Sequence, residues 1–315
     1  MLHLRLFAFL LASLHIAASQ AADPPRRVLL VTHAGGHMHE SLLVAEQVLK
    51  EIGPKQGLDV TCFRFTSDPD AMVKVKRQID GKETVLETTA LEDYSFRFRQ
   101  RNGEVVTRAH CGRINAGTLK NYDAVVFFTT STWYSSRGSH PVNADELQDL
   151  LAWVRGGGGF VGVHCATDTL YGTPYGDLVG AVFDGHPWIQ QVRLRIEDAE
   201  HPAAAGWKDG PEIFDEIYQF HFVPYNRDRL HIILSVDNSS IDVKKGNRTS
   251  GIFTDQDYAV SWCRRFGKGR SFYTSLGHFK EVWRNPRFQA HLIGGLQWAL
   301  GRLPGDATPS ANLKK

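Results

Sequence analysis

The hydrophobic and polar positions of this chain follow a repeating pattern of short apolar runs and amphipathic stretches. Apolar runs that predict buried strands lie at residues 26–33, 58–65, 122–130, 160–164 and 269–278. Amphipathic stretches that predict helices lie at residues 39–53, 143–159 and 286–301, with Asn143 as a helix N-cap and Gly156 as a helix stop. Strands that alternate with helices predict an α/β fold with a mostly parallel sheet and helices on both faces.

Two segments depart from this alternation. Residues 70–118 are charged, and their Asn102-Gly103 pair is typical of a hairpin turn, so we expect an inserted antiparallel lobe there. Residues 185–260 contain further alternating strands, at 191–198 and 229–237, which predict an antiparallel extension of the sheet. One domain then covers residues 23–304, and the polar tail at 305–315 is expected to be disordered.

The first 22 residues have a composition of their own. A single basic residue, Arg5, precedes an apolar run from Leu6 to Leu14, and small residues follow at Ser19 and Ala21. This order is typical of a secretory signal peptide, and the run is too short to span a bilayer. We therefore expect cleavage near residue 22 and an exported protein, periplasmic or extracellular, with no membrane insertion.

Charge and cysteine content narrow the classes of partner. The formal net charge is +2 and falls to +1 when Arg5 leaves with the signal peptide, which gives no reason to expect nucleic acid as a partner. Four cysteines in 315 residues are too few for a disulfide scaffold. We expect a small-molecule ligand and a homo-oligomer.

Polar and aromatic side chains gather just after the predicted strands, where open parallel sheets bind their ligands. The candidates are His33, His37 and His39 after the first strand, Trp133 and Tyr134 after the third, His164, Cys165 and Asp168 after the fourth, and His278 after the last. Four loops that converge on one edge of a sheet predict a functional site there.

Two stretches beyond the fourth strand combine aromatic rings with carboxylates and histidines. They place His186 near Trp188, and Asp215 near Tyr218. Aromatic rings cover the apolar faces of a sugar while polar groups bind its hydroxyls, so these residues suit carbohydrate binding. Core packing is the alternative for Trp188 and Tyr218, because large aromatic side chains dominate protein cores.

The HAGGHMH segment raises the question of a bound metal. Neutral imidazole is a common ligand of zinc and other late transition metals, so we expect a divalent metal, zinc first, at His33, His37 and His164. Gly35 and Gly36 offer the alternative of an oxyanion or phosphate cradle. The segment lacks the Gly-Lys-Ser/Thr ending of a P-loop, and no nucleotide cofactor is expected.

Several segments, taken in order, resemble the ThuA-like (trehalose utilisation) family. They are VLLVTHAGGHMHES, YDAVVFFTTS, GGGGFVGVHCATD, FDGHPW, FDEIYQF and GKGRSFYTSLGH, followed by FQAHLIGGLQWALG. The resemblance extends from about residue 27 to residue 302. It implies a flavodoxin-like sheet, as in class I glutamine amidotransferases, and a link with sugar catabolism.

The same resemblance bears on the strand end at His164. Class I amidotransferases carry a nucleophilic cysteine at the centre of a Gly-x-Cys-x-Gly elbow. The matching frame is Gly162-Val163-His164-Cys165-Ala166, so His164 stands at the position of the nucleophile and Cys165 is displaced by one residue. Adjacent residues at a strand end point to opposite sides, so Cys165 should face away from the site. A glutaminase is therefore not expected.

The sequence supports three hypotheses. The first is an exported enzyme that acts on a disaccharide or keto-sugar, with His164, Asp168 and Asp215 as catalytic residues. In this hypothesis the sugar-binding residues are Trp133, Tyr134, His186, Trp188, Tyr218 and His278. The second is a non-catalytic sugar-binding protein on the same fold. The third is a hydrolase that depends on Cys165 as its nucleophile.

Overall fold

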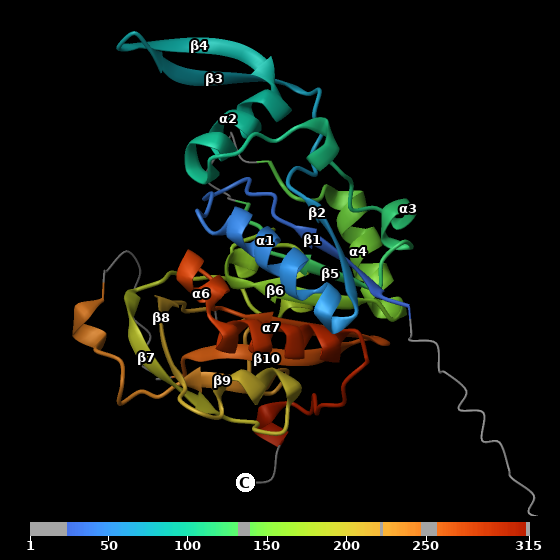
Figure 1. The fold of residues 1–315 in the computed structure, drawn as a ribbon, viewed down its shortest axis with the longest axis vertical. Helices are drawn as coiled ribbons and strands as arrows, with labels where there is room; N and C mark the ends of the chain where they lie inside the picture. The colour runs from blue at the N-terminus through green and yellow to red at the C-terminus, as the bar shows by residue number, and fades with distance from the viewer. Residues whose placement is uncertain (1–23, 132–138, 221–222, 247–256, 313–315) are drawn as a thin grey trace, which may run out of the picture.

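The computed structural model describes residues 24–131, 139–220, 223–246 and 257–312. In the described chain one large sheet has nine strands in the order β2-β1-β5-β6-β11-β10-β9-β7-β8 (Figure 1). The expected signal peptide, residues 1–22, lies outside the described residues. None of the described helices combines the length and the apolarity needed to cross a bilayer.

The parallel half of the sheet confirms the strands expected from the apolar runs. It consists of β2 (Leu58–Phe63), β1 (Arg26–Val31), β5 (Ala124–Phe127), β6 (Gly159–Val163) and β11 (Gly269–Thr274), and each neighbouring pair is parallel. The central strands are apolar on both faces because helices cover both. The carboxyl ends of β1, β5, β6 and β11 therefore lie side by side at one edge.

The other half of the sheet is the expected antiparallel extension. It consists of β10 (Ala259–Phe266), β9 (His231–Val236), β7 (Trp188–Ile196) and β8 (Glu212–Ile217), each antiparallel to its neighbour. β8 lies at the far edge and was not predicted, because half of its sequence, EIFDEI, is acidic. The predicted α/β class with an antiparallel extension is confirmed.

Two layers of helices cover the two faces of the sheet. One contains α1 (Leu42–Ile52), α6 (Lys280–Arg284) and α7 (Pro286–Ala299), and the other contains α3 (Ala116–Leu119), α4 (Ala144–Gly156) and α5 (Tyr175–Val179). In β1, Val28 and Leu30 point into the first core while Leu29 points into the second. The Asn143 side chain caps α4 as predicted, accepting a hydrogen bond from the Glu146 amide at 2.9 Å.

Short 3-10 turns complete the described secondary structure. They lie at Pro54–Gln56, Arg108–His110, His164–Thr167, Pro202–Trp207, Val243–Lys245 and Ser310–Asn312. The turn at His164–Thr167 follows β6 directly, so the chain changes direction at the first residue after the strand.

A hairpin and a helix form a lobe that projects from the sheet (Figure 1). β3 (Met72–Ile79) pairs antiparallel with β4 (Lys82–Thr89), and α2 (Ala90–Asn102) follows directly. The hairpin turn is Asp80-Gly81, with positive φ at both residues. The predicted turn at Asn102-Gly103 is wrong, because this pair ends α2, with Gly103 as a left-handed C-cap.

The lobe leaves the sheet and returns to it at one place. Phe65, just after β2, forms a parallel bridge with Cys111. The Arg64 amide donates to the His110 carbonyl at 2.9 Å, and the Gly112 amide donates to the Phe65 carbonyl at 3.0 Å. The chain on either side of the lobe is thus joined by backbone hydrogen bonds.

The expected disorder of the tail is wrong for residues 305–312, which pack against the start of β9. The Ser310 amide donates to the Leu230 carbonyl at 2.9 Å, and the Ile232 amide donates to the Ser310 hydroxyl at 2.8 Å. The Thr308 carbonyl accepts from His231 Nδ1 at 2.7 Å. Polar tail residues satisfy backbone groups of the sheet here, which composition alone does not indicate.

Candidate functional site

Three buried or half-buried histidines meet at the edge where the parallel strands end. His39 follows β1, His164 follows β6 and His278 follows β11, and one ligand atom from each lies within 4.8 Å of the others. We name these three residues the central histidine cluster. The predicted convergence of strand-end loops thus brings side chains from distant parts of the sequence together.

His164 is held in a sparsely populated backbone conformation. Its φ is +46°, in the left-handed region that non-glycine residues rarely adopt. The Tyr273 hydroxyl donates to the His164 carbonyl at 2.7 Å, and Gly277 passes so close that a Cβ there would lie 3.6 Å from the His164 Cβ. The surrounding chain therefore fixes a strained residue, which is typical of functional positions.

The ring of His164 presents one nitrogen to the cluster. Nδ1 lies 2.7 Å from the Ser275 carbonyl, which can only accept, so Nδ1 carries the proton. In the neutral ring Nε2 then has a lone pair. Nε2 lies 2.9 Å from the Tyr218 hydroxyl and 3.2 Å from Nδ1 of His278. A backbone carbonyl that fixes the tautomer in this way is a common device behind metal-ligating histidines.

Glu216 is the carboxylate that faces these histidines, and the sequence analysis did not select it. Its carboxylate oxygens lie 3.4 Å from His164 Nε2, 3.1 Å from His278 Nδ1 and 3.1 Å from His186 Nδ1. Burial alone would raise its pKa, but the neighbouring His164 and His278 imidazoles hold the pKa below its usual range. The same partnership raises the pKa of His278 against the opposing effect of burial.

Asp215, predicted to be catalytic, has a different role. Its carboxylate is fully buried and accepts the backbone amides of Gly277 at 2.7 Å and His278 at 3.2 Å. It also accepts the amide of Glu216 at 2.9 Å. Asp215 is therefore a positioning residue that fixes the loop carrying His278. The prediction chose the wrong one of two neighbouring carboxylates, because strand residues alternate in direction and the register was unknown.

His39 forms the third side of the cluster and lies beside a cavity. The residue is buried, and its Nδ1 has no hydrogen-bond partner among the described residues. Burial and the neighbouring imidazoles lower its pKa well below the usual value. A cavity of about 350 Å³ adjoins the cluster, lined by His37, His39, Glu40, Arg101, His278, Phe279, Lys280 and Glu281. Of the three cluster histidines, His39 and His278 line this cavity, and His164 lies behind them.

The predicted metal set His33, His37 and His164 is not assembled. His33 Nδ1 lies 2.9 Å from the Thr66 hydroxyl and Nε2 lies 2.6 Å from the Ser139 hydroxyl, so both nitrogens are occupied. Burial, followed by the charge of Arg97, lowers the pKa of His33 to about 3. His37 lies next to His39, with ring centroids 4.7 Å apart, and lines the cavity without joining the cluster. From this loop it is His39, rather than His33 or His37, that joins the cluster.

The glycine cradle in the same loop is also excluded. The Gly35 amide donates to the Thr130 carbonyl at 2.8 Å, and the Gly36 amide donates to the same carbonyl at 3.3 Å. Amides that are already bonded to the protein cannot hold an oxyanion or a phosphate. A Cβ on Gly35 would also collide with the Ser139 carbonyl, so this glycine is required for close packing.

Cys165 and Asp168 follow His164 in the sequence, but neither belongs to the central histidine cluster. Cys165 is fully buried within the core, and burial raises the pKa of its thiol well above the usual value, which disfavours the reactive thiolate. Asp168 accepts a hydrogen bond from the Tyr171 hydroxyl at 2.5 Å. Burial raises the pKa of Asp168 to about 6, while the charge of His164 acts in the opposite direction.

The predicted sugar-binding residues separate into three groups. Tyr218 and His278 contact His164, and His186 lies 3.1 Å from Glu216 with its side chain 36% exposed. Trp188 is fully buried in the core, packed edge-on against Tyr258, so its predicted contact with a sugar is wrong and the core-packing alternative holds. Trp133 and Tyr134 lie outside the described residues.

The central histidine cluster fits a small divalent cation. A tetrahedral zinc ion holds its nitrogen ligands roughly 3.4 Å apart, close to the 3.2 Å between His164 Nε2 and His278 Nδ1. Nδ1 of the buried His39, like Nε2 of His201 and of His291, has no hydrogen-bond partner among the described residues, so it is free to bind a ligand. Three imidazoles with an open fourth position are a donor set typical of catalytic zinc.

Comparison with known proteins identifies the family and supports the fold. A family model for ThuA, described as trehalose utilisation, matches residues 27–299. The chain is similar to the structure of a ThuA-like protein from Bacteroides uniformis, with 18% identity, a TM-score of 0.56, and coverage of 90% of this chain and 94% of that chain. A ThuA-like protein from Parabacteroides merdae shows 17% identity, a TM-score of 0.55, and coverage of 90% and 92%. No curated protein matches the chain. At these identities the structures show the fold alone.

Proposed function

Because the chain belongs to the ThuA (trehalose utilisation) family, we propose that it is an enzyme that acts on a disaccharide or a keto-sugar at the central histidine cluster. The observation that carries the proposal is the meeting of His39, His164 and His278 with the Glu216 carboxylate at the carboxyl edge of the sheet. Perturbed, buried titratable groups beside a cavity are a usual feature of active sites.

We propose that His39, His164 and His278 hold a divalent metal, zinc first. A bound metal would polarise a sugar oxygen or lower the pKa of a bound water. The Ser275 carbonyl supports this role because it keeps the proton of His164 on Nδ1, and Asp215 supports it by fixing the loop of His278. This set replaces the one predicted from the sequence and shares only His164 with it.

The remaining residues supply hydrogen bonds and charge. The Tyr218 hydroxyl lies 2.9 Å from His164 Nε2, beside the proposed metal position, and is placed there to donate a hydrogen bond to a sugar oxygen. Glu216 stays ionised 3.1 Å from His278 Nδ1 and 3.4 Å from His164 Nε2, where its charge would balance that of a bound cation. The His186 side chain is 36% exposed and lies 3.1 Å from Glu216, so it is placed to bind a hydroxyl of a sugar that approaches from solvent. A thiol mechanism at Cys165 has no support, because the thiol is buried with a raised pKa.

Export of the protein is part of the proposal. The apolar run from Leu6 to Leu14, with small residues at Ser19 and Ala21, supports a cleaved signal peptide. N-terminal sequencing of the protein secreted or exported by its host tests this part. A mature chain that begins at Met1 contradicts it.

Metal analysis of purified protein tests the site. We expect about one zinc per chain, lost in His164→Asn, because asparagine tolerates the left-handed backbone at this position. His291→Gln is the matched control, since His291 is equally buried but lies outside the cluster. If both variants retain zinc, or if the wild-type protein contains none, the metal assignment is contradicted. Turnover of trehalose or of an oxidised trehalose with a ring ketone tests the reaction, and full turnover by His164→Asn contradicts the proposed function.

A further inference from the structure

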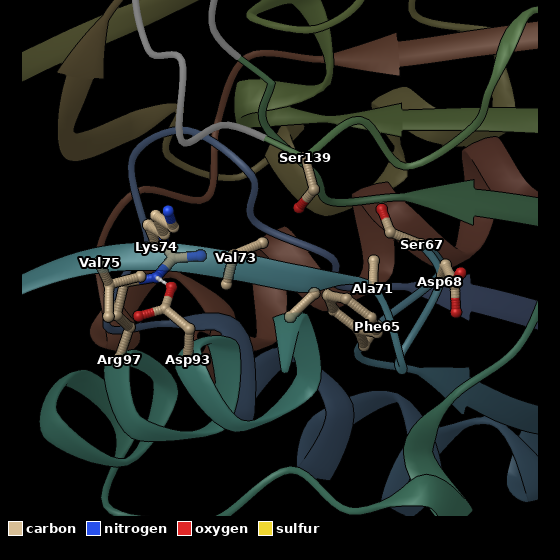
Figure 2. A pocket seen from close by; sticks show the side chains of 11 residues that line it. Phe65, Ser67, Asp68, Ala71, Val73, Lys74, Val75, Asp93, Arg97 and Ser139 are labelled. Carbon is tan, nitrogen blue, oxygen red and sulfur yellow. Dashed lines mark hydrogen bonds and ion pairs between the residues drawn. The ribbon is translucent and has the colours of Figure 1, made fainter. Parts of the chain in front are cut away.

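Two faces of α2 differ in what they contact. Asp93 and Arg97 face a cavity of about 480 Å³ that lies between this helix and the hairpin (Figure 2). Tyr94, Phe98 and Asn102 are spaced by four residues and share a second face. Tyr94 and Phe98 are buried in the core that also contains α1. The helix is therefore held in the core by one face and borders a cavity with the other.

The buried face of α2 contacts the loop that carries His39. At the start of this loop, the Tyr94 hydroxyl accepts from the Ala34 amide at 2.9 Å and donates to the Thr32 carbonyl at 3.3 Å. Near its end, Asn102 Nδ2 donates to the His39 carbonyl at 3.3 Å. Both ends of the loop are thus bonded to one helix of the lobe, and the second bond holds the backbone of a histidine of the cluster.

The same Asn102 side chain acts in place of an N-cap at α1. Its Oδ1 accepts from the Leu43 amide, the second of that helix, at 3.4 Å. This amide is a usual partner of the N-cap side chain, and the N-cap residue here is Ser41. A serine at this position normally caps its own helix, but Ser41 makes no side-chain capping bond. The lobe therefore satisfies an amide of α1 and leaves the Ser41 hydroxyl for another partner.

The Ser41 hydroxyl bonds to the loop that carries His278. It donates to the His278 carbonyl at 2.7 Å and lies 3.3 Å from the Gly277 carbonyl. Ser41 is fully buried and follows His39 by two residues. One short segment thus carries one histidine of the cluster and holds the backbone of another. Because Asp215 accepts the His278 amide, both the amide and the carbonyl of this residue are fixed.

Two of the three cluster histidines are held by these contacts. The His39 ring centroid lies 5.2 Å from that of His278 and 5.0 Å from that of His164. His164 is held separately, by the Ser275 carbonyl and the Tyr273 hydroxyl. A ligand set works only when each member is held within about 0.5 Å of its productive position. Residues that hold the backbones of His39 and His278 therefore control how well the three rings share one ion.

We propose that Asn102 and Ser41 are positioning residues that set His39 and His278 for the bound metal. This inference rests on the proposed function and adds a role for the lobe, which supplies no histidine to the cluster. The lobe acts through the last residue of α2, whose amide group holds the His39 carbonyl and caps α1. Ser41 then links the His39 segment to the His278 loop.

Removal of each side chain tests the proposal. In Asn102→Ala and Ser41→Ala, competition with a chelator measures the Kd for Zn²⁺, and the visible absorption of bound Co²⁺ reports its coordination geometry. Phe98→Leu is the matched control on α2, because Phe98 is buried on the same face and its side chain makes no hydrogen bond. Ser261→Ala controls for a lost buried hydroxyl, since Ser261 lies on β10 and its Oγ has no partner among the described residues. Thermal unfolding checks that each variant folds.

We expect Asn102→Ala and Ser41→Ala each to weaken zinc binding by about tenfold to 100-fold and to change the Co²⁺ spectrum. Ser41→Thr keeps the hydroxyl and should restore most of the affinity. Phe98→Leu should lower the thermal midpoint and leave the zinc Kd unchanged, and Ser261→Ala should also leave the Kd unchanged.

Three outcomes would overturn the positioning role. If wild type binds zinc and both alanine variants bind it equally well, the role is wrong while the proposed function stands. If Phe98→Leu weakens zinc binding as much as Asn102→Ala does, packing of the lobe sets the site and the named hydrogen bonds do not. If wild type binds no zinc, the proposed metal site and this inference are both overturned.

Discussion

Two groups of buried histidines differ in what their rings face. In the central histidine cluster, His164 and His278 face each other and share the Glu216 carboxylate. A second group, which we name the tail histidine cluster, consists of His201, His231 and His291 and lies near the C-terminal segment. Both groups are rich in imidazole, and only the first adjoins a cavity among those described.

Each ring of the tail histidine cluster is fixed by its own local partner. His231 lies between the Thr308 carbonyl at 2.7 Å and Asp198 at 2.8 Å. His291 Nδ1 lies 2.6 Å from the Ala203 carbonyl, and the His201 side chain caps the 3-10 turn that contains Ala203. These contacts tie the tail, β9 and α7 together. The number of buried histidines in a group therefore does not identify a functional site. Imidazoles that converge on a shared carboxylate are the better indicator.

The carboxylate of each cluster offers the strongest test of this contrast. Glu216→Gln should lower turnover about 10³-fold, because it removes the charge that orients His278 and His164, while the chain still folds. Asp198→Asn should leave turnover unchanged and lower the free energy of unfolding by about 1–3 kcal/mol, because it weakens the bond to His231. Steady-state kinetics and urea unfolding on both variants provide the measurement. Equal losses of turnover would show that the two clusters do not differ in role.

Removal of the tail should affect only the second cluster. A chain that ends at Gly305 loses the Thr308 contact with His231 and the Ser310 contacts with β9. With about 1 kcal/mol for each lost hydrogen bond, we expect a loss of roughly 3 kcal/mol in unfolding free energy. The zinc content of the central histidine cluster should stay the same. An unchanged unfolding midpoint would support the disordered tail that composition suggested.

Acid sensitivity is expected from buried neutral histidines of the tail histidine cluster. Burial lowers the pKa of His201 and of His291 to about 4 from an ordinary value of 6.5. The unfolded chain therefore binds more protons between pH 6.5 and pH 4. The stability that each ring contributes is complete above pH 6.5 and falls by about 1.4 kcal/mol per pH unit as the pH drops towards 4.

The variant His291→Gln isolates one of these rings, because glutamine keeps a donor for the Ala203 carbonyl and does not titrate. The difference in unfolding free energy between wild type and variant should shift in favour of the variant from pH 7 to pH 5. Urea unfolding at both pH values measures it, and the difference cancels the contributions of other titrating groups. If the difference in unfolding free energy does not change with pH, the lowered pKa of His291 is not a cause of acid sensitivity.

The sequence predicted the framework of the fold because burial leaves a direct pattern. The apolar runs of β1, β5 and β6 are covered on both faces, so their positions follow from hydrophobicity alone. Helix α2 was missed because its composition is polar, although Thr89 and Glu92 form a capping box that could have revealed its start. The sequence also contains the pair Asp80-Gly81, which is equally typical of a hairpin turn, but the turn was predicted at Asn102-Gly103.

The candidate site was predicted in outline and not in detail. His164 and His278 were selected because they follow strands, and the structure brings them to 3.2 Å. Which residue of a loop or strand points inward depends on register and on tertiary contacts, so His33 was chosen over His39 and Asp215 over Glu216. Contacts such as Ser139 with His33 join residues far apart in sequence, and no local pattern reports them.

The joined ends of the lobe have a consequence for how such proteins can diversify. Because Phe65 and Cys111 are bridged, the intervening segment behaves as a cassette inserted at a closed junction. A cassette of this kind can be lengthened, shortened or exchanged between relatives while the strand order is inherited intact. Changes in the hairpin and α2 could then accumulate without altering the strand order of the sheet.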